Sequence, residues 1–123
     1  MLNRMASAVL AVGIMVFSPW AIAQDEVLTG DQIKAAWSGK KLFIRSTTSG
    51  LLDLSLHADG TAAFSVGNFS DTGTWRTTDN GYCAKWQKLR QGAEACFKVI
   101  KRDGKTLTLD EAGKVTGEVL RVI

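Results

Sequence analysis

The chain has 123 residues, with 15 Lys and Arg, 12 Asp and Glu, one His and two Cys. This length is enough for one domain with one hydrophobic core. One histidine and two cysteines do not supply the paired His and Cys ligands of a zinc site, so we expect neither a metal nor a cofactor.

The first 23 residues have the pattern of a secretory signal peptide. Arg4 gives a basic start, residues 6–17 form a continuous apolar run, and residues 21–23 supply small side chains for cleavage. The run is too short for a permanent anchor, and no cysteine follows the cleavage site to accept a lipid. We expect a periplasmic or secreted product that begins at Gln24 and is not membrane-anchored. The alternative is a retained helix that tethers the protein to the membrane.

Residues 24–123 are expected to form a single small β-barrel domain. Without Arg4 it keeps fourteen basic residues against twelve acidic ones, which is nearly neutral. The basic excess is local, so one edge of the domain should be positive. Seven basic residues lie between Cys83 and Lys105, namely Lys85, Lys88, Arg90, Lys98, Lys101, Arg102 and Lys105.

The mature chain opens with a signal for one short helix. Thr29 and Gln32 have the spacing of a capping box, and Ile33 and Trp37 fall on one helical face before Gly39 ends the run. A helix of two to three turns depends on packing for its stability. We therefore expect Ile33 and Trp37 to lie against the domain and to cover one end of it.

From Lys41 onward the apolar period changes to two, which predicts strands. The predicted strands are Leu42 to Thr47, Leu51 to His57, Thr61 to Val66, Gly73 to Thr77, Tyr82 to Gln87, Ala95 to Lys101, Thr106 to Asp110 and Val115 to Val122. Short glycine-containing turns join nearly all of them, so consecutive strands should pair antiparallel. The predicted fold class is mainly β: an up-and-down antiparallel meander of about eight strands that forms a small barrel, preceded by one short N-terminal helix.

The alternation also predicts which side chains lie inside the barrel. The predicted inward residues are Leu52, Leu54, Leu56, Phe64, Val66, Trp75, Tyr82, Trp86, Phe97, Val99, Leu107, Leu109, Val115 and Val119. Such bulky side chains favour a packed interior over one that holds a small ligand. We expect Trp75 and Trp86 to pack against each other, or against Tyr82 and Phe97.

The two cysteines lie on neighbouring predicted strands. If Cys83 faces Cys96 in an antiparallel pair, Lys85 faces Glu94 and Tyr82 faces Phe97, and both are sensible cross-strand partners. In an oxidising compartment this pair is most simply a structural disulfide.

Several short motifs, in order along most of the mature chain, resemble a family of small exported Gram-negative proteins of unknown function. They are L-T-G-D-Q-I at 28–33, D-G-T at 59–61, G-T-W at 73–75, and C-x-x-W with C-F at Cys83, Trp86, Cys96 and Phe97. The resemblance implies a lipocalin-like or calycin-like small β-barrel. It implies no activity.

Candidate catalytic residues are few. His57 shares a predicted strand face with Asp53 and Ser55, a pattern that an ordinary solvated face also gives. There is no G-x-S-x-G and no phosphate loop, so we expect a protein that is not an enzyme and has no catalytic residues.

The basic hairpin is the candidate binding surface. It comprises Trp86, Lys88, Leu89, Arg90, Lys98, Lys101 and Arg102. A loop held by a disulfide and carrying arginine with apolar groups suits recognition of a protein or an anionic envelope component, and export makes nucleic acid an improbable partner. The alternatives are an inhibitor of an envelope-directed hydrolase such as a protease or lysozyme, a carrier of a small apolar ligand, and lysines that only protect strands from aggregation. The sequence does not determine an oligomeric state.

Overall fold

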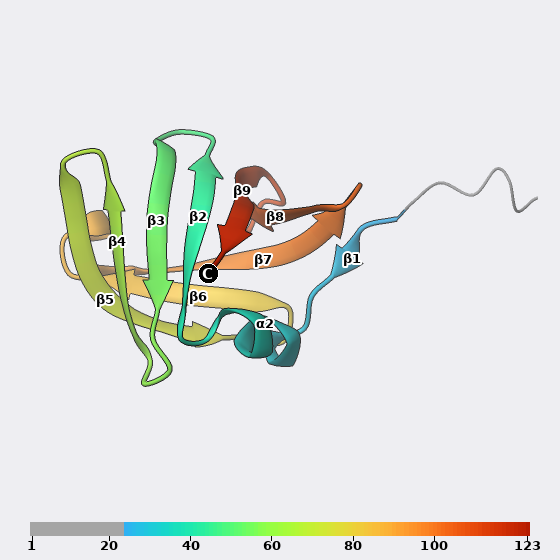
Figure 1. Ribbon diagram of the computed structural model, residues 1–123, viewed down its shortest axis with the longest axis horizontal. Helices are drawn as coiled ribbons and strands as arrows, with labels where there is room; N and C mark the ends of the chain where they lie inside the picture. Colours follow the sequence, from blue (N-terminus) through green and yellow to red (C-terminus); the bar gives the residue numbers. More distant parts are fainter. Residues whose placement is uncertain (1–23) are drawn as a thin grey trace, which may run out of the picture.

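The computed structural model describes residues 24–123, and the signal peptide expected over residues 1–23 lies outside the described residues. The described chain forms nine strands, one α-helix and one short 3-10 turn (Figure 1). In order they are β1 (Glu26–Val27), α2 (Gly30–Trp37), β2 (Lys40–Ser46), β3 (Gly50–Leu56), β4 (Thr61–Val66), β5 (Phe69–Thr77), β6 (Gly81–Trp86), η3 (Leu89–Gly92), β7 (Glu94–Arg102), β8 (Lys105–Leu109) and β9 (Val115–Val122).

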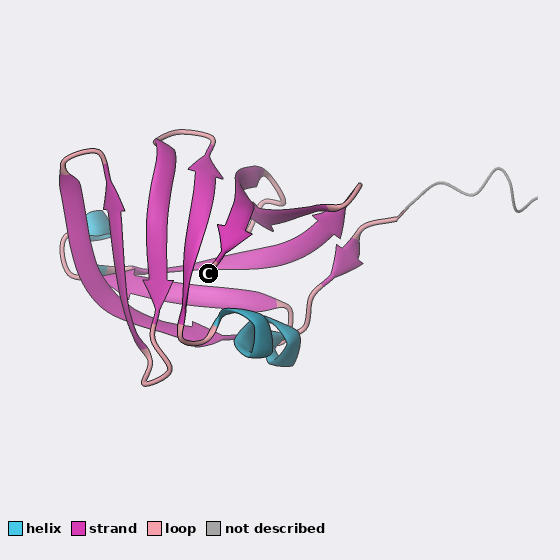
Figure 2. Ribbon diagram, viewed as in Figure 1, coloured by secondary structure: helices cyan, strands magenta, loops and turns pink. Residues whose placement is uncertain are grey.

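Strands β2 to β9 form a closed antiparallel barrel (Figure 2). Each strand pairs with the next one along the chain, and β9 also pairs with β2. The predicted meander of eight strands is thus confirmed, since the two-residue β1 only adds to the outer edge of β7. Among residues 24–123, no helix is long and apolar enough to cross a membrane.

The strands match their predicted bounds within one or two residues, with one exception. Strand β5 begins at Phe69, four residues before the predicted start at Gly73. The predicted register between β6 and β7 is confirmed: Cys83 pairs with Cys96, Lys85 with Glu94 and Tyr82 with Phe97. The two sulfur atoms form the predicted disulfide.

Helix α2 closes one end of the barrel, as predicted. The Thr29 hydroxyl accepts the Gln32 N–H at 3.1 Å, and the Gln32 side chain accepts the Thr29 N–H at 2.9 Å, which completes the capping box. Ile33 and Trp37 are buried, and the Trp37 ring packs edge-on against Tyr82. Gly30 lets the helix start approach the β5–β6 turn, because a Cβ at this position would overlap the Thr78 carbonyl.

A main core fills the part of the barrel next to α2. Its members include Ile33, Trp37, Leu42, Leu56, Ala62, Trp75 and Val99, all of which are buried. Among residues 24–123, and contrary to the expectation from the sequence, no ring pair joins Trp75 to Trp86, or either of them to Tyr82 or Phe97. Trp86 packs edge-on against Phe64 with ring centroids 4.6 Å apart, whereas the Trp75 indole N–H donates to the His57 carbonyl at 2.8 Å. Tyr82 and Phe97 pack on each other instead.

Leu107, Leu109 and Val115 do not point into the barrel as predicted; they belong to a second, smaller cluster. Leu107 and Leu109 pack with Ile100 and Val115, apart from the main core. The cause is the strand register: Val99 is inside, and its partner across the β7–β8 ladder is Thr108. Cross-strand partners share a face, so Leu107 and Leu109 point to the opposite, outer side.

Candidate binding cavity in the barrel

The end of the barrel opposite α2 is hollow. Here residues in or beside the connections after β2, β4 and β6 line a cavity of about 440 Å³. Figure 1 shows the β2–β3 and β4–β5 connections at the end of the barrel away from α2. We name this cavity the cup. It is lined by Ile44, Ser46, Thr47, Thr48, Ser49, Leu52, Leu54, Phe64, Val66, Phe69, Tyr82, Ala84, Trp86, Leu89, Arg90, Phe97, Thr108 and Thr116. Its volume lies in the range typical of small-molecule sites. The predicted packed interior is therefore found only in the half next to α2.

The cup has an apolar wall and a hydroxyl-bearing wall. Phe64 lies between Phe69 and Trp86, with ring centroids 5.7 and 4.6 Å away, and these rings form one side. Hydroxyls from the β2–β3 connection and from Thr108 and Thr116 form the other side. Short side chains such as Ala84 and Thr108 at interior positions leave the space that larger residues would fill.

The turn η3 forms part of the rim and has an unusual backbone. Arg90 and Gln91 both adopt left-handed conformations, with φ of 57° and 55°, and Gly92 follows with φ of 83°. Two consecutive non-glycine residues in this region are strained unless the surroundings fix them. The predicted loop from Lys88 to Gln91 is thus a defined turn that directs Arg90 to the cup.

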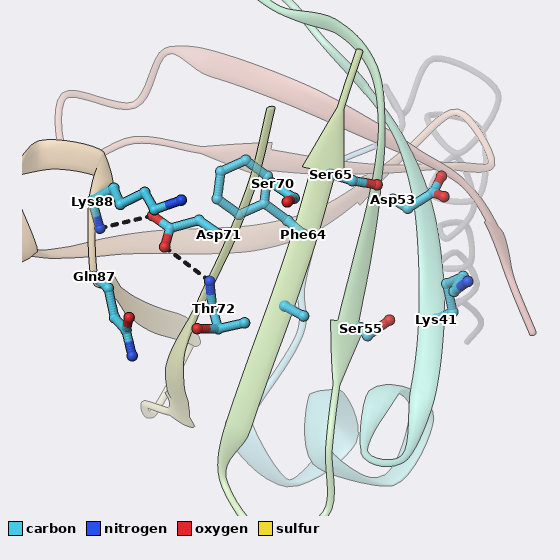
Figure 3. Close-up of a pocket in the computed structure, with 11 residues that line it drawn as sticks. Lys41, Asp53, Ser55, Phe64, Ser65, Ser70, Asp71, Thr72, Gln87 and Lys88 are labelled. Atoms are coloured by element: carbon cyan, nitrogen blue, oxygen red, sulfur yellow. Dashed lines mark hydrogen bonds between the residues drawn. The ribbon is translucent and has the colours of Figure 1, made fainter. Parts of the chain in front are cut away.

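Asp71 is the residue that fixes this turn. Its carboxylate is only 5% exposed and accepts the Lys88 and Leu89 N–H groups at 2.9 Å each. Its other oxygen accepts the Thr72 N–H at 2.9 Å, and Figure 3 shows the carboxylate pointing toward Lys88. Burial raises the pKa of Asp71, but the hydrogen bonds from Leu89, Lys88 and Thr72 outweigh it, so the pKa lies below its ordinary value.

The charge of the cup comes from one side chain. Among the described residues, Arg90 is the only charged residue in the lining, and it has no ion-pair partner. Lys88 is not part of the lining, and its ammonium lies 5.9 Å from the centre of the Phe69 ring. The negative charge of Asp71 is engaged by backbone amides. The mouth of the cup therefore carries unpaired positive charge.

The predicted binding surface is divided by the fold. Lys88, Leu89 and Arg90 come together at η3, whereas Trp86 lies inside the barrel with 8% exposure. Lys101 and Arg102 lie at the far end of β7, where Arg102 forms a bidentate ion pair with Asp25. Lys98 lies between the two groups, on the outer face opposite Gly81. Only the η3 residues can act together with the cup.

The outer face of β3 to β5 contains a groove of about 450 Å³ (Figure 3). Asp53 and Ser55 line it together with Ser65, Ser70 and Lys41. His57 is exposed at the end of β3 and does not line this groove, and the nearby Asp59 carboxylate is engaged by Thr61. Short serine side chains between longer ones account for the hollow without a ligand.

The disulfide accounts for the one cluster of ligand-type side chains in the described part of the chain. Cys83, Glu94 and Cys96 have their polar atoms within 4.8 Å of one another. The sulfur atoms are bonded to each other, and Glu94 accepts two hydrogen bonds from Arg76. These groups are therefore not available to hold a metal.

Seven of the residues predicted to point inward line the cup, together with Leu89 and Arg90 of the predicted binding surface, but the sequence did not predict a cavity there. The lining residues that the sequence analysis missed include Phe69 and residues 46–49, and it also missed Asp71, which holds the η3 turn. The run Asp71-Thr72-Gly73 resembles an ordinary turn, and nothing local marks Asp71 as buried. The chain matches no protein-family model, no curated protein and no solved structure in the comparisons made.

Proposed function

We propose that this protein is a non-enzymatic binding protein for a small anionic amphiphile. The apolar part of the ligand lies in the cup, and its anionic group lies at Arg90. The observation that carries the proposal is the composition of the lining: aromatic and aliphatic side chains along the wall and Arg90 as the single charge at the rim, among the described residues. Pockets of this kind gain affinity from apolar burial and selectivity from a few placed polar groups.

The η3 turn gives Arg90 a fixed position before any ligand arrives. Asp71 holds the two preceding amides, and the Cys83–Cys96 disulfide joins the strands on either side of the turn. A preorganised cation loses little conformational entropy on binding. This favours Arg90 as a recognition group over a lysine that only protects an edge.

We also propose that the protein acts outside the cytoplasm, in the periplasm or as a secreted protein. Two features support this: the secretory pattern of residues 1–23 and the disulfide, which persists in oxidising compartments. A small lipocalin-like carrier of envelope-derived amphiphiles agrees with both. The mass of the protein recovered from the periplasm should then correspond to a chain that starts at Gln24.

The test compares ligands that share a decyl chain and differ in the head group. Decanoate, decanol and decyltrimethylammonium are titrated into the purified mature protein by calorimetry, with tryptophan fluorescence as a second signal from Trp86. We expect decanoate to bind more tightly than decanol by about fivefold, which corresponds to about 1 kcal/mol for an ion pair at an exposed rim. The cationic ligand should bind most weakly.

Arg90→Gln is the test variant and Lys101→Gln the matched control. Lys101 is also exposed and basic, but it lies at the far end of β7. Arg90→Gln should remove the preference for decanoate over decanol, and Lys101→Gln should retain it. If none of the three ligands binds, the cup is not a ligand site; if decanol equals decanoate in the wild type, the anionic head group is wrong.

A second candidate function is inhibition of an envelope-directed hydrolase by the η3 turn. The supporting observation is that Leu89 is 39% exposed on this fixed turn, between Lys88 and Arg90. Such a turn could insert into a catalytic cleft. A panel of lysozymes and trypsin-like proteases provides the test: at least one should be slowed by the wild type and not by the Lys88→Glu/Arg90→Glu variant. No effect across the panel would exclude inhibition of these enzymes.

A further inference from the structure

One residue that lines the cup has a buried hydroxyl with no partner among residues 24–123. Tyr82 lines the cup and is 6% exposed, and its ring packs against Trp37 and Phe97. No group within residues 24–123 forms a hydrogen bond with its hydroxyl. Burial raises the pKa of Tyr82 above its ordinary value, so the side chain stays a neutral donor at physiological pH.

The other hydroxyls of the cup are satisfied. Thr108 and Thr116 are 2.9 Å apart at their hydroxyl oxygens, and the Thr47 hydroxyl donates to the Thr116 carbonyl at 3.2 Å. Ser46 accepts backbone N–H groups from Thr48 and Ser49. Against this background, Tyr82 is the lining hydroxyl without a partner among the described residues.

A second unpaired donor belongs to the same strand, β6. Trp86 is 8% exposed and lines the cup, and no group in the described chain accepts its indole N–H. Buried donors are normally paired, and leaving one unpaired destabilises the protein. Tyr82 and Trp86 both line the cup, so an acceptor that enters it from outside the protein would give these donors the partner they lack.

We propose that the ligand has two polar ends: an anionic group at Arg90 and a hydrogen-bond acceptor, such as a hydroxyl or carbonyl oxygen, that reaches Tyr82 inside the cup. This inference rests on the proposed function, since it assigns the buried end of the same ligand. Trp86 supplies a second donor to that end. The cup then selects oxygenated amphiphiles over plain alkyl chains.

The test uses pairs of ligands that differ only at the buried end. Decanoate and dodecanoate are each compared with their ω-hydroxy derivatives on the wild type, on Tyr82→Phe and on the control variant Lys101→Gln. In the wild type and in Lys101→Gln, at least one ω-hydroxy ligand should bind roughly fivefold to tenfold more tightly than its parent. In Tyr82→Phe this preference should fall to near unity, while the parent ligands retain their affinity.

Two measurements report on the hydroxyl directly. The chain has one tyrosine, so a carbon-13 label at its ζ carbon gives a single NMR signal, which should shift with the ω-hydroxy ligand and remain nearly unchanged with the parent acid. In the free protein, Tyr82→Phe should melt at the same temperature as the wild type or higher, because it removes an unpaired buried group. A clearly lower melting temperature would show that the hydroxyl already has a partner and would overturn the inference.

The binding results separate the two proposals. If the parent acids bind and the ω-hydroxyl gives no advantage, this inference is wrong and the cup remains a site for a simple anionic amphiphile. An advantage that persists in Tyr82→Phe also overturns the role of Tyr82. If no member of the series binds to the wild type, the proposed function fails and the assignment of the buried end fails with it.

Discussion

Asp71 is a buried carboxylate that forms no ion pair within residues 24–123 and instead accepts hydrogen bonds from three backbone N–H groups. If the Asp71 carboxylate is removed, these buried N–H groups lose their hydrogen-bond acceptor and cannot bond to water instead, which destabilises the fold. Two of the three amides, from Lys88 and Leu89, set the start of the turn that places Arg90 at the rim. The position of Arg90 thus depends on an acid that does not itself line the cup.

Asp71→Asn should loosen η3 and lower the melting temperature at neutral pH, because a carboxamide offers the Lys88 and Leu89 N–H groups a weaker acceptor. The pKa of Asp71 is lowered in the folded state, so its contribution is complete above the unfolded value of about 3.9 and is lost as the pH falls through the folded value. Between about pH 5 and pH 3, the wild type should therefore lose more stability than Asp71→Asn. Thermal melts across this range provide the measurement.

The matched control for this prediction is Asp53→Asn. Asp53 lines the outer groove, and its carboxylate makes no hydrogen bond with residues 24–123. The control should follow the wild-type pH profile. Parallel profiles for the wild type and Asp71→Asn would contradict the role given to the Asp71 carboxylate.

Trp75 tests whether the barrel is filled at the end next to α2. Its side chain is 8% exposed in the main core and donates to the His57 carbonyl. Trp75→Ala should lower the free energy of unfolding by about 3 to 5 kcal/mol, as for a large aromatic removed from a packed core. Leu52→Ala in the wall of the cup should cost less, because Leu52 adjoins open space. Urea denaturation of both variants makes the comparison, and equal losses would mean that the two ends are packed alike.

At the scale of elements, the β6–β7 hairpin combines most of the chain's special features. Its disulfide joins Cys83 to Cys96 across 13 residues of sequence, and the enclosed segment contains η3. Cys83→Ser/Cys96→Ser should lower the free energy of unfolding by about 2 to 4 kcal/mol. Reduction of the wild type should reproduce the loss. An unchanged denaturation midpoint in both experiments would show that the crosslink contributes nothing to stability.

The elements that the sequence predicted well are those with local signals. The capping box of Thr29 and Gln32 marks the start of α2, and the opposed pairs around Cys83 and Cys96 establish the β6–β7 register. Strand β1 has no comparable signal, because two residues contain no measurable period. It forms where Val27 and Glu26 meet the free edge of β7, next to the ion pair between Asp25 and Arg102.

The alternation of apolar and polar residues gave the wrong inward face for β8, because pairing with β7 determines which of its side chains point into the barrel. In β8 the leucines alternate with threonines, and the pattern alone predicts that Leu107 and Leu109 point inward. Pairing with Val99 turns Thr108 inward instead, where it bonds to Thr116. The same interior threonines leave room for the cup. Arg90 and Gln91 give no sequence signal for left-handed backbone either, and Asp71, which holds the two amides before them, is remote in sequence.

For the molecule as a whole, the barrel has a packed end and an open end. Amide exchange should reflect this difference: slow for amides around Leu42, Leu56 and Val99, and faster for those of residues 47–49 and η3. Saturation with a cup ligand at about 100 times its dissociation constant should stabilise the fold by about 2.7 kcal/mol and slow exchange at the open end. Mass-spectrometric exchange with and without the ω-hydroxy acid gives both readings. Protection confined to the α2 end would place the ligand elsewhere.

The pairing of β2 with β9 has a consequence for how the chain is made. This ladder joins Leu42 to Val122. One edge of β2 therefore stays unpaired until nearly the whole chain has been synthesised. During synthesis, strands β2 to β8 can pair one after another while that edge of β2 is still unpaired. Open edges are templates for pairing with other chains. A nascent molecule halted before residue 115 would therefore be a client for a chaperone, or a partner for a second halted copy.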